Sequence, residues 1–125
     1  MAKFSLSFSF LCFIVLFSSL GIIGRNMAKK LALEQKTWCV AKPSTEEVEL
    51  GNNIEFACNQ IGVDCSIIQE GGQCYNPVSP INHASVAMNL YFQRAGRFAF
   101  NCDFSNSGLM VLTDPSYGAC LYSFI

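Results

Sequence analysis

The sequence predicts a small, secreted α+β domain that is crosslinked by three disulfides. Three observations lead to this fold class: a hydrophobic leader, six cysteines in the chain that follows it, and two helical patterns followed by two short strand patterns. An even set of cysteines in so short a domain is typical of a disulfide framework, provided that the chain reaches an oxidising compartment. The leader supplies that condition.

Residues 1–27 have the pattern of a secretory signal peptide. A cationic start with Lys3 precedes the apolar residues 8–17, and small residues such as Gly21 and Gly24 suit signal peptidase. An uncleaved membrane anchor is the alternative, but the run 8–23 is shorter than a spanning helix needs and is interrupted by Ser18 and Ser19. We therefore expect removal of residues 1–27, Cys12 included, and a single domain over residues 28–125.

The charge balance of the mature chain excludes some classes of partner. From Lys29 onward there are six Lys and Arg against nine Asp and Glu, which gives a net charge of −3. Nucleic acids and anionic membrane surfaces are bound mainly through positive charge, and the sequence has no basic run that could supply it. Neutral ligands or other proteins are the expected partners.

The folded part is expected to begin near Lys36, and Pro43 ends any strand that starts there. Ser44 and Glu47 form a capping-box pattern that predicts a helix over residues 45–59. One stripe of that helix is expected to face the core, namely Val48, Ile54, Ala57, Cys58 and Ile61.

Residues 60–80 are rich in Gly, Asp, Ser and Pro, which predicts a loop that a short Cys58 to Cys65 crosslink can close. A second helix is expected over residues 83–95, with Asn82 as its N-cap and Gly96 as its end. Its expected buried face consists of Ala84, Ala87, Met88, Tyr91 and Ala95.

Two strands are expected in the last part of the chain. Apolar and polar residues alternate over residues 98–104, which predicts a half-buried strand with Phe98, Phe100 and Phe104 in the core. A turn over residues 105–108 then leads to a second strand over residues 109–113.

Several motifs together resemble a known family, the plant carbohydrate-binding module family 43. They cover residues 36–122 and match in order and spacing: WCVAK at 38–42, ACN at 57–59, GGQCYNP at 71–77, HAS at 83–85, MNLYFQ at 88–93, NCDF at 101–104 and TDPSYGAC at 113–120. This family occurs as a C-terminal domain of endo-1,3-β-glucanases, in plasmodesmatal callose-binding proteins and as free-standing secreted proteins that include pollen allergens.

The resemblance implies two helices packed with a small antiparallel sheet and three disulfides. The implied pairs are Cys39 with Cys102, Cys58 with Cys65, and Cys74 with Cys120. Cysteine spacing alone leaves all fifteen connectivities of six cysteines open.

The resemblance also implies non-catalytic binding of 1,3-β-glucan, the polymer of callose, in the apoplast or cell wall. A sugar site combines aromatic faces with a few placed polar groups. The candidate ligand-binding residues are Tyr75, Asn89, Tyr91, Gln93, Arg97, Asp103 and Tyr117.

Each candidate has a purely structural alternative. Tyr91 lies on the predicted helix stripe and can belong to the core, and Trp38 can cover a disulfide instead of serving as a platform. Arg97 can neutralise the end of the second helix or pair with Asp103. Tyr75 and Tyr117 lie in Gly/Pro-rich loops, where binding residues are common, so we favour these two as stacking residues.

An enzyme is not expected. The glutamates Glu46, Glu47 and Glu49 are interpreted as a solvated helix face, and His83 is the only histidine. We expect no catalytic residue, no cofactor and no metal, and a monomer without a stable membrane anchor. The alternative function is that of a disulfide-stabilised interaction or defence protein without sugar affinity.

Overall fold

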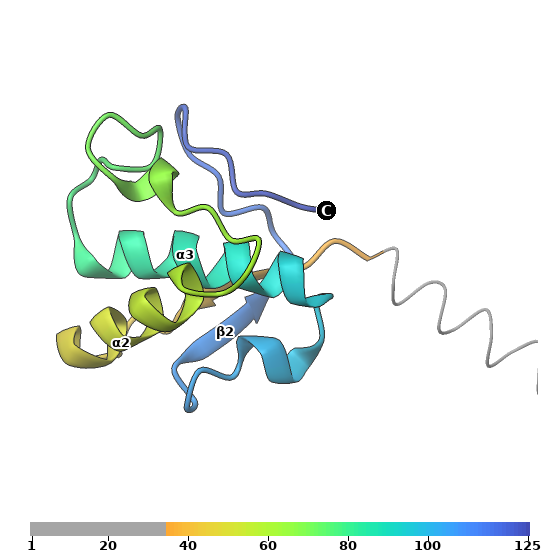
Figure 1. The fold of residues 1–125 in the computed structure, drawn as a ribbon. Helices are drawn as coiled ribbons and strands as arrows, with labels where there is room; N and C mark the ends of the chain where they lie inside the picture. Colours follow the sequence, from red (N-terminus) through yellow and green to blue (C-terminus); the bar gives the residue numbers. More distant parts are fainter. Residues whose placement is uncertain (1–34) are drawn as a thin grey trace, which may run out of the picture. The chain divides into compact units, whose positions relative to one another are not determined.

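In the computed structural model, which describes residues 35–125, helix α3 (Pro80–Ala95) is the element that contacts most of the others. Figure 1 shows α3 lying alongside α2 (Glu47–Cys58). The remaining elements are β1 (Trp38–Ala41), β2 (Gly108–Val111) and two short 3₁₀ helices, η1 (Ser66–Ile68) and η2 (Ala99–Cys102). The predicted signal peptide lies outside the described residues.

Helix α3 begins three residues earlier than the sequence pattern predicts. Its N-cap is Ser79, whose hydroxyl oxygen accepts a hydrogen bond from the Asn82 backbone N–H at 3.2 Å, and Pro80 occupies the first turn. Proline is well suited to that position because its missing N–H would have no partner there. The predicted N-cap Asn82 is therefore wrong, whereas the end at Gly96, with φ 108°, is confirmed.

Helix α2 is shorter and rotated relative to the prediction. The predicted capping box is wrong, because the N-cap is Glu46 and its side chain makes no capping hydrogen bond. Val48 and Ile61 are 77% and 93% exposed, and the buried stripe is Leu50, Asn53 and Ala57. Asn53 faces inward because its amide donates to the Ser107 hydroxyl at 2.8 Å.

The sheet has two antiparallel strands, with Trp38 opposite Val111 and Ala41 opposite Gly108. Strand β2 corresponds to the predicted strand 109–113. The other predicted strand, over residues 98–104, is wrong: this segment forms η2, in which the Asn101 N–H donates to the Phe98 carbonyl at 2.9 Å. Phe98 and Phe100 consequently lie on the surface and not in the core.

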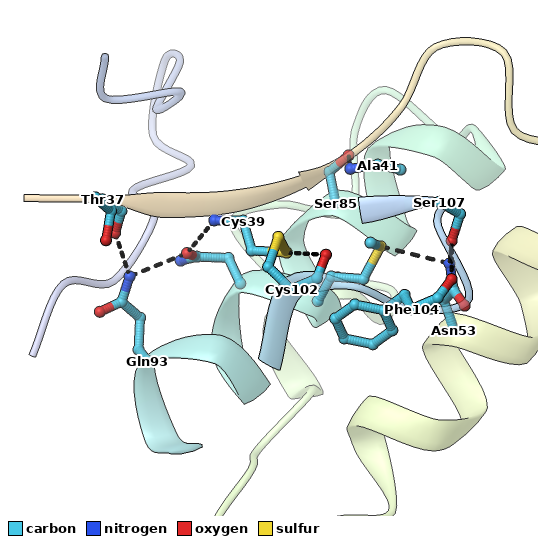
Figure 2. Close-up of a disulfide and its surroundings, with 11 residues drawn as sticks. Thr37, Cys39, Ala41, Asn53, Ser85, Gln93, Cys102, Phe104 and Ser107 are labelled. Atoms are coloured by element: carbon cyan, nitrogen blue, oxygen red, sulfur yellow. Dashed lines mark hydrogen bonds between the residues drawn. A yellow bond between two sulfur atoms is a disulfide. The ribbon is translucent and has the colours of Figure 1, made fainter. Parts of the chain in front are cut away.

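The outer edge of β1 is covered by side chains of α3. The hydroxyl oxygen of Ser85 accepts from the Ala41 N–H at 3.0 Å, and the Gln93 amide donates to the Thr37 carbonyl at 2.9 Å (Figure 2). Backbone groups of a buried strand edge must be paired, and here a helix takes the place of a third strand.

Three disulfides link these elements, and their pairs are those that the family resemblance implies: Cys39–Cys102, Cys58–Cys65 and Cys74–Cys120. The Cys39–Cys102 bond lies in a core cluster with Leu50, Met88 and Phe92. The Cys74–Cys120 bond packs with Val86 in a second cluster. The predicted fold class, a small disulfide-rich α+β domain, is confirmed.

No helix within residues 35–125 is both long and apolar enough to cross a membrane.

Candidate functional site

A cleft of about 450 Å³ opens between α2 and the chain that leads from η2 toward β2. We call it the α2–η2 cleft. Most of its lining comes from four segments: α2 (Glu49, Asn52, Asn53, Phe56), α3 (Tyr91), η2 (Phe100, Asn101) and the following turn (Asp103, Phe104, Ser105).

Three aromatic rings that contact one another edge to face contribute to the lining of the cleft. The ring centroids of Phe56 and Tyr91 lie 5.2 Å apart, those of Tyr91 and Phe104 5.8 Å, and those of Phe56 and Phe104 6.0 Å. The Tyr91 hydroxyl donates to the Asn101 side-chain oxygen at 3.4 Å. Mutual packing and this hydrogen bond hold the rings in place before any ligand arrives.

Two of the lining rings are exposed to solvent. Phe100 is 75% exposed and Phe56 is 48% exposed. Phe98, which does not line the cleft, stacks against Phe100 with an interplanar angle of 4° and a centroid distance of 5.5 Å. Phe98 therefore supports an apolar ring that the folded chain itself leaves uncovered.

The turn after η2 brings Phe104 and Ser105 into the cleft through an unusual backbone. Phe104, Ser105 and Asn106 have φ values of 45°, 52° and 67°. Left-handed conformations cost about 1–2 kcal/mol per non-glycine residue, so such a turn needs external support. Asn53 and Lys42 supply it, through hydrogen bonds to the Ser107 hydroxyl at 2.8 Å and to the Asn106 carbonyl at 2.8 Å.

Figure 2 shows the contribution of Asn53, which reaches from α2 toward Ser107 and Phe104. The Ser107 hydroxyl also donates to the Phe104 carbonyl at 2.5 Å. The polar lining residues of the cleft come from two segments: Glu49 and Asn52 from α2, and Asp103 and Ser105 from the chain that follows η2.

The structure separates the candidate residues that the sequence indicated. Only Tyr91 and Asp103 line the α2–η2 cleft. Tyr75 and Tyr117 lie near the start of α3. There Tyr75 stacks on His83 at 5.7 Å, and the Tyr117 hydroxyl lies 2.8 Å from the Asn82 side-chain oxygen.

Asn89 and Gln93 do not face solvent, which corrects their place among the ligand-binding candidates. They are 1% and 3% exposed, and both amides are used within the protein. The Asn89 amide donates to the Ser123 carbonyl at 3.0 Å, and the Gln93 amide oxygen accepts from the Ile125 N–H at 3.4 Å. Both side chains therefore pair with backbone groups of the protein.

The Arg97 side chain contacts the C-terminal segment. Its guanidinium lies over the Phe124 ring, 4.9 Å from the centroid, and donates to the Ile125 carbonyl oxygen. Trp38 is buried beside the same Phe124 ring at 6.0 Å, so it is not an exposed platform. Both residues hold the C-terminal segment.

Phe56 and Phe100 were missed by sequence reasoning. Phe100 was placed in the core because residues 98–104 alternate like a strand. Phe56 could have been found from its spacing, because Glu49, Asn52 and Phe56 are separated by three and four residues and therefore share one face of α2.

Within the described part of the chain, no group of three or more His, Cys, Asp or Glu side chains is placed to hold a metal ion.

In a comparison with protein families, the X8 domain matches residues 37–109 of the chain. Among curated proteins, the chain is 50% identical over 84 residues to a glucan endo-1,3-beta-D-glucosidase of Olea europaea. It is 45% identical over 87 residues to the major pollen allergen Ole e 10 of the same species, and 38% identical over 90 residues to the plasmodesmata callose-binding protein 5 of Arabidopsis thaliana.

These matches differ in how much of the relative they cover. Each spans 67–72% of this chain, but only 18% of the glucosidase, 50% of the callose-binding protein and 71% of the pollen allergen. The shared region is therefore a small part of the glucosidase and most of the allergen.

Proposed function

Because the chain belongs to the X8 domain family, which is carbohydrate-binding module family 43, we propose that its folded part is a non-catalytic module that binds 1,3-β-glucan. Relatives that carry the same domain are named for action on 1,3-β-glucan or for binding of callose. We further propose that the α2–η2 cleft is the binding site.

The solvent-exposed ring of Phe100 at the cleft is the observation that carries this assignment. A large apolar ring at the surface is stabilised when a ligand covers it, and the CH-rich face of a pyranose ring is a suitable cover. Asn52, Asp103 and Ser105 lie in the same cleft and can hydrogen-bond to the hydroxyl groups at the sugar edge.

Affinity electrophoresis tests both the ligand and the site. The oxidised protein, residues 28–125, is run through gels that contain soluble 1,3-β-glucan or, as a control, a soluble cellulose derivative. We expect retardation by the 1,3-β-glucan alone. Absence of retardation in correctly disulfide-bonded protein would contradict the proposed function and favour a protein that binds other partners without sugar affinity.

Three variants locate the site. Phe100→Ala removes the exposed cleft ring, and the double variant Tyr75→Ala/Tyr117→Ala removes the two tyrosines near α3. Ile61→Ala is a control for loss of an exposed apolar side chain that does not line the cleft. We expect retardation to be lost only in Phe100→Ala. Loss of retardation only in the tyrosine variant would indicate that the binding site lies near the start of α3.

Binding without hydrolysis is part of the proposal. Glu49 and Asp103 both line the cleft, and glycosidases use pairs of carboxylates, so turnover needs its own measurement. We expect no release of reducing sugar from a soluble 1,3-β-glucan. Release that disappears in Glu49→Gln or Asp103→Asn would identify a hydrolase instead.

We also propose that the protein acts as a secreted monomer in the cell wall after removal of residues 1–27. The three disulfides support this location, because such crosslinks persist in oxidising compartments. N-terminal sequencing of protein collected from the wall fluid of expressing plant cells tests the cleavage, with Ala28 as the expected first residue. Size-exclusion chromatography tests the monomer.

A further inference from the structure

The α2–η2 cleft is flanked by a further hollow on each side along α2. Near the C-terminal end of the helix it shares Asn52 and Phe56 with a second hollow, whose other lining residues are Glu55, Asn59 and Gln60. Toward the N-terminal end it shares Glu49 with a third hollow, which is lined further by Lys42, Ser44, Thr45, Glu46, Val48, Asn106 and Ser107.

Helix periodicity indicates that the three hollows form one line. Glu46, Glu49, Asn52, Phe56 and Asn59 follow one another at intervals of three and four residues, so they lie along a single stripe of α2. From residue 46 to residue 59 this stripe is about 20 Å long at the rise of an α-helix. We call the three joined hollows the α2 groove.

The chemistry of the α2 groove changes from its centre to its ends. The exposed aromatic rings Phe56 and Phe100 lie at the centre. Toward the ends the lining is mainly polar, with hydroxyl, amide and carboxylate side chains such as Thr45, Glu46, Glu55 and Asn59 beside Phe56 and the exposed Val48. The amine of Lys42 is already engaged, since it donates to the Asn106 carbonyl and side-chain oxygens at 2.8 and 2.9 Å.

A groove that continues on both sides of its aromatic centre fits a chain that passes through it. A pocket closed at one end would recognise a terminal sugar, whereas polar side chains at both ends can hydrogen-bond to the hydroxyl groups of the sugars on either side. We propose that the α2 groove binds an internal stretch of a 1,3-β-glucan, laid along α2 with its central sugar on the aromatic rings. This inference rests on the proposed function.

Isothermal titration with 1,3-β-linked oligosaccharides of increasing length tests the proposal. We expect affinity to keep rising after the oligosaccharide is long enough to fill the central cleft, because longer chains reach the polar ends. A long oligosaccharide whose reducing end has been reduced to the alditol is expected to bind within about twofold of the unreduced chain, since no chain end is recognised.

Three glutamates of α2 provide a matched set of variants. Glu46 lines the hollow at the N-terminal end and Glu55 the hollow at the C-terminal end, whereas Glu47 is exposed and lines none of the three hollows. We expect Glu46→Ala and Glu55→Ala each to weaken binding of long oligosaccharides by about three- to tenfold, the effect of one lost hydrogen bond. Short oligosaccharides are expected to bind all three variants like the unmodified protein.

Two results would overturn the proposal while leaving the proposed function intact. One is an affinity that stops rising at the length of the central cleft, with Glu46→Ala and Glu55→Ala indistinguishable from Glu47→Ala. The other is a large loss of affinity for the end-reduced chain, which would indicate recognition of a terminus. Failure to bind any 1,3-β-glucan, polymer included, would overturn the proposed function together with this inference.

Discussion

The side-chain oxygen of Asn89 accepts a hydrogen bond from the backbone N–H of Cys39 at 3.1 Å. The same oxygen accepts from the Gln93 amide at 3.1 Å, and the Asn89 amide donates to the Ser123 carbonyl at 3.0 Å. One side chain of α3 therefore joins the edge of β1 to the C-terminal segment. A side chain of the helix thus pairs with a backbone group of β1, as a neighbouring strand would in a larger sheet.

Asn89→Ala is expected to lower the free energy of unfolding by about 2–4 kcal/mol, because it leaves buried partners without hydrogen bonds. Urea denaturation followed by circular dichroism measures the change. Ser85→Ala, which removes only the acceptor of the Ala41 N–H, is expected to cost about 1–2 kcal/mol. An Asn89→Ala effect no larger than that of the exposed Glu55→Ala would contradict the role of this residue.

Two glycine substitutions are expected to have opposite effects on stability. A Cβ atom at Gly51 would meet nothing within 4 Å, whereas one at Gly108 would lie 1.7 Å from the Cys102 carbonyl oxygen. Gly51→Ala in the middle of α2 should stabilise the fold by about 0.5–1 kcal/mol, because alanine favours the helix.

Gly108→Ala should displace the backbone beside the Cys39–Cys102 disulfide and lower the midpoint of thermal unfolding by at least about 10 °C, the change that about 2 kcal/mol produces in a domain of this size. Differential scanning calorimetry compares the two variants. An unchanged midpoint in Gly108→Ala would show that β2 approaches Cys102 less closely than described.

The three disulfides are expected to differ in their resistance to reduction. Cys58 and Cys65 are partly exposed, whereas the cysteines of the other two bonds are buried. A mild reductant should therefore open Cys58–Cys65 first. Alkylation of the freed thiols and mass spectrometry of the peptides identify which bond opens; earlier opening of Cys74–Cys120 would contradict the expectation.

The loss of stability on removing a disulfide should increase with the length of chain that the disulfide closes. Cys58–Cys65 has a sequence separation of 7 and Cys39–Cys102 one of 63. On the chain-entropy model, loss of the short crosslink costs about 2–3 kcal/mol and loss of the long one about 4 kcal/mol. We expect Cys58→Ser/Cys65→Ser to fold and to bind glucan, and Cys39→Ala/Cys102→Ala to lack a cooperative unfolding transition.

Stability should fall at alkaline pH because of Tyr122. Burial, with a smaller effect of the neighbouring Tyr117, raises the pKa of Tyr122 to about 12 from its ordinary value of 10.0. The folded protein thus holds the phenolic proton more tightly than the unfolded chain. The stabilisation is fully present below pH 10 and is lost as the pH rises from 10 to 12.

The loss is expected to be about 1–2 kcal/mol, less than the full pKa difference implies, because Tyr122 is partly exposed and solvent screens its charge. Urea denaturation at pH 9 and pH 11 measures it. Tyr122→Phe should reduce this pH dependence, and a slope equal to that of the unmodified protein would contradict the assignment to Tyr122.

Local patterns in the sequence were sufficient for much of the fold. Gly96 ends α3 because it adopts positive φ at no steric cost, and the loop around Cys58 and Cys65 follows from its Gly, Asp and Ser residues. The cysteine count and the motifs shared with the family indicated three disulfides and the class of ligand. Each of these features depends on neighbouring residues or on a resemblance that the sequence itself carries.

The candidate site could not be predicted from local patterns, because its residues come together only in the tertiary structure. The alternation over residues 98–104 predicted a strand, but the segment forms the 3₁₀ helix η2, which leaves Phe100 exposed. Asn89 and Gln93 are of residue types that often bind sugars, yet their side chains pair with backbone groups of the protein.

Local patterns therefore predicted both helices and strand β2, and the family resemblance implied the three disulfide pairs. Contacts between distant segments set which face of α2 is buried, which aromatic rings remain uncovered and which amides are already hydrogen-bonded. The physical reason is that periodicity records how often a residue type recurs along the chain, whereas the partner of a backbone N–H or an aromatic ring is chosen among residues far away in sequence.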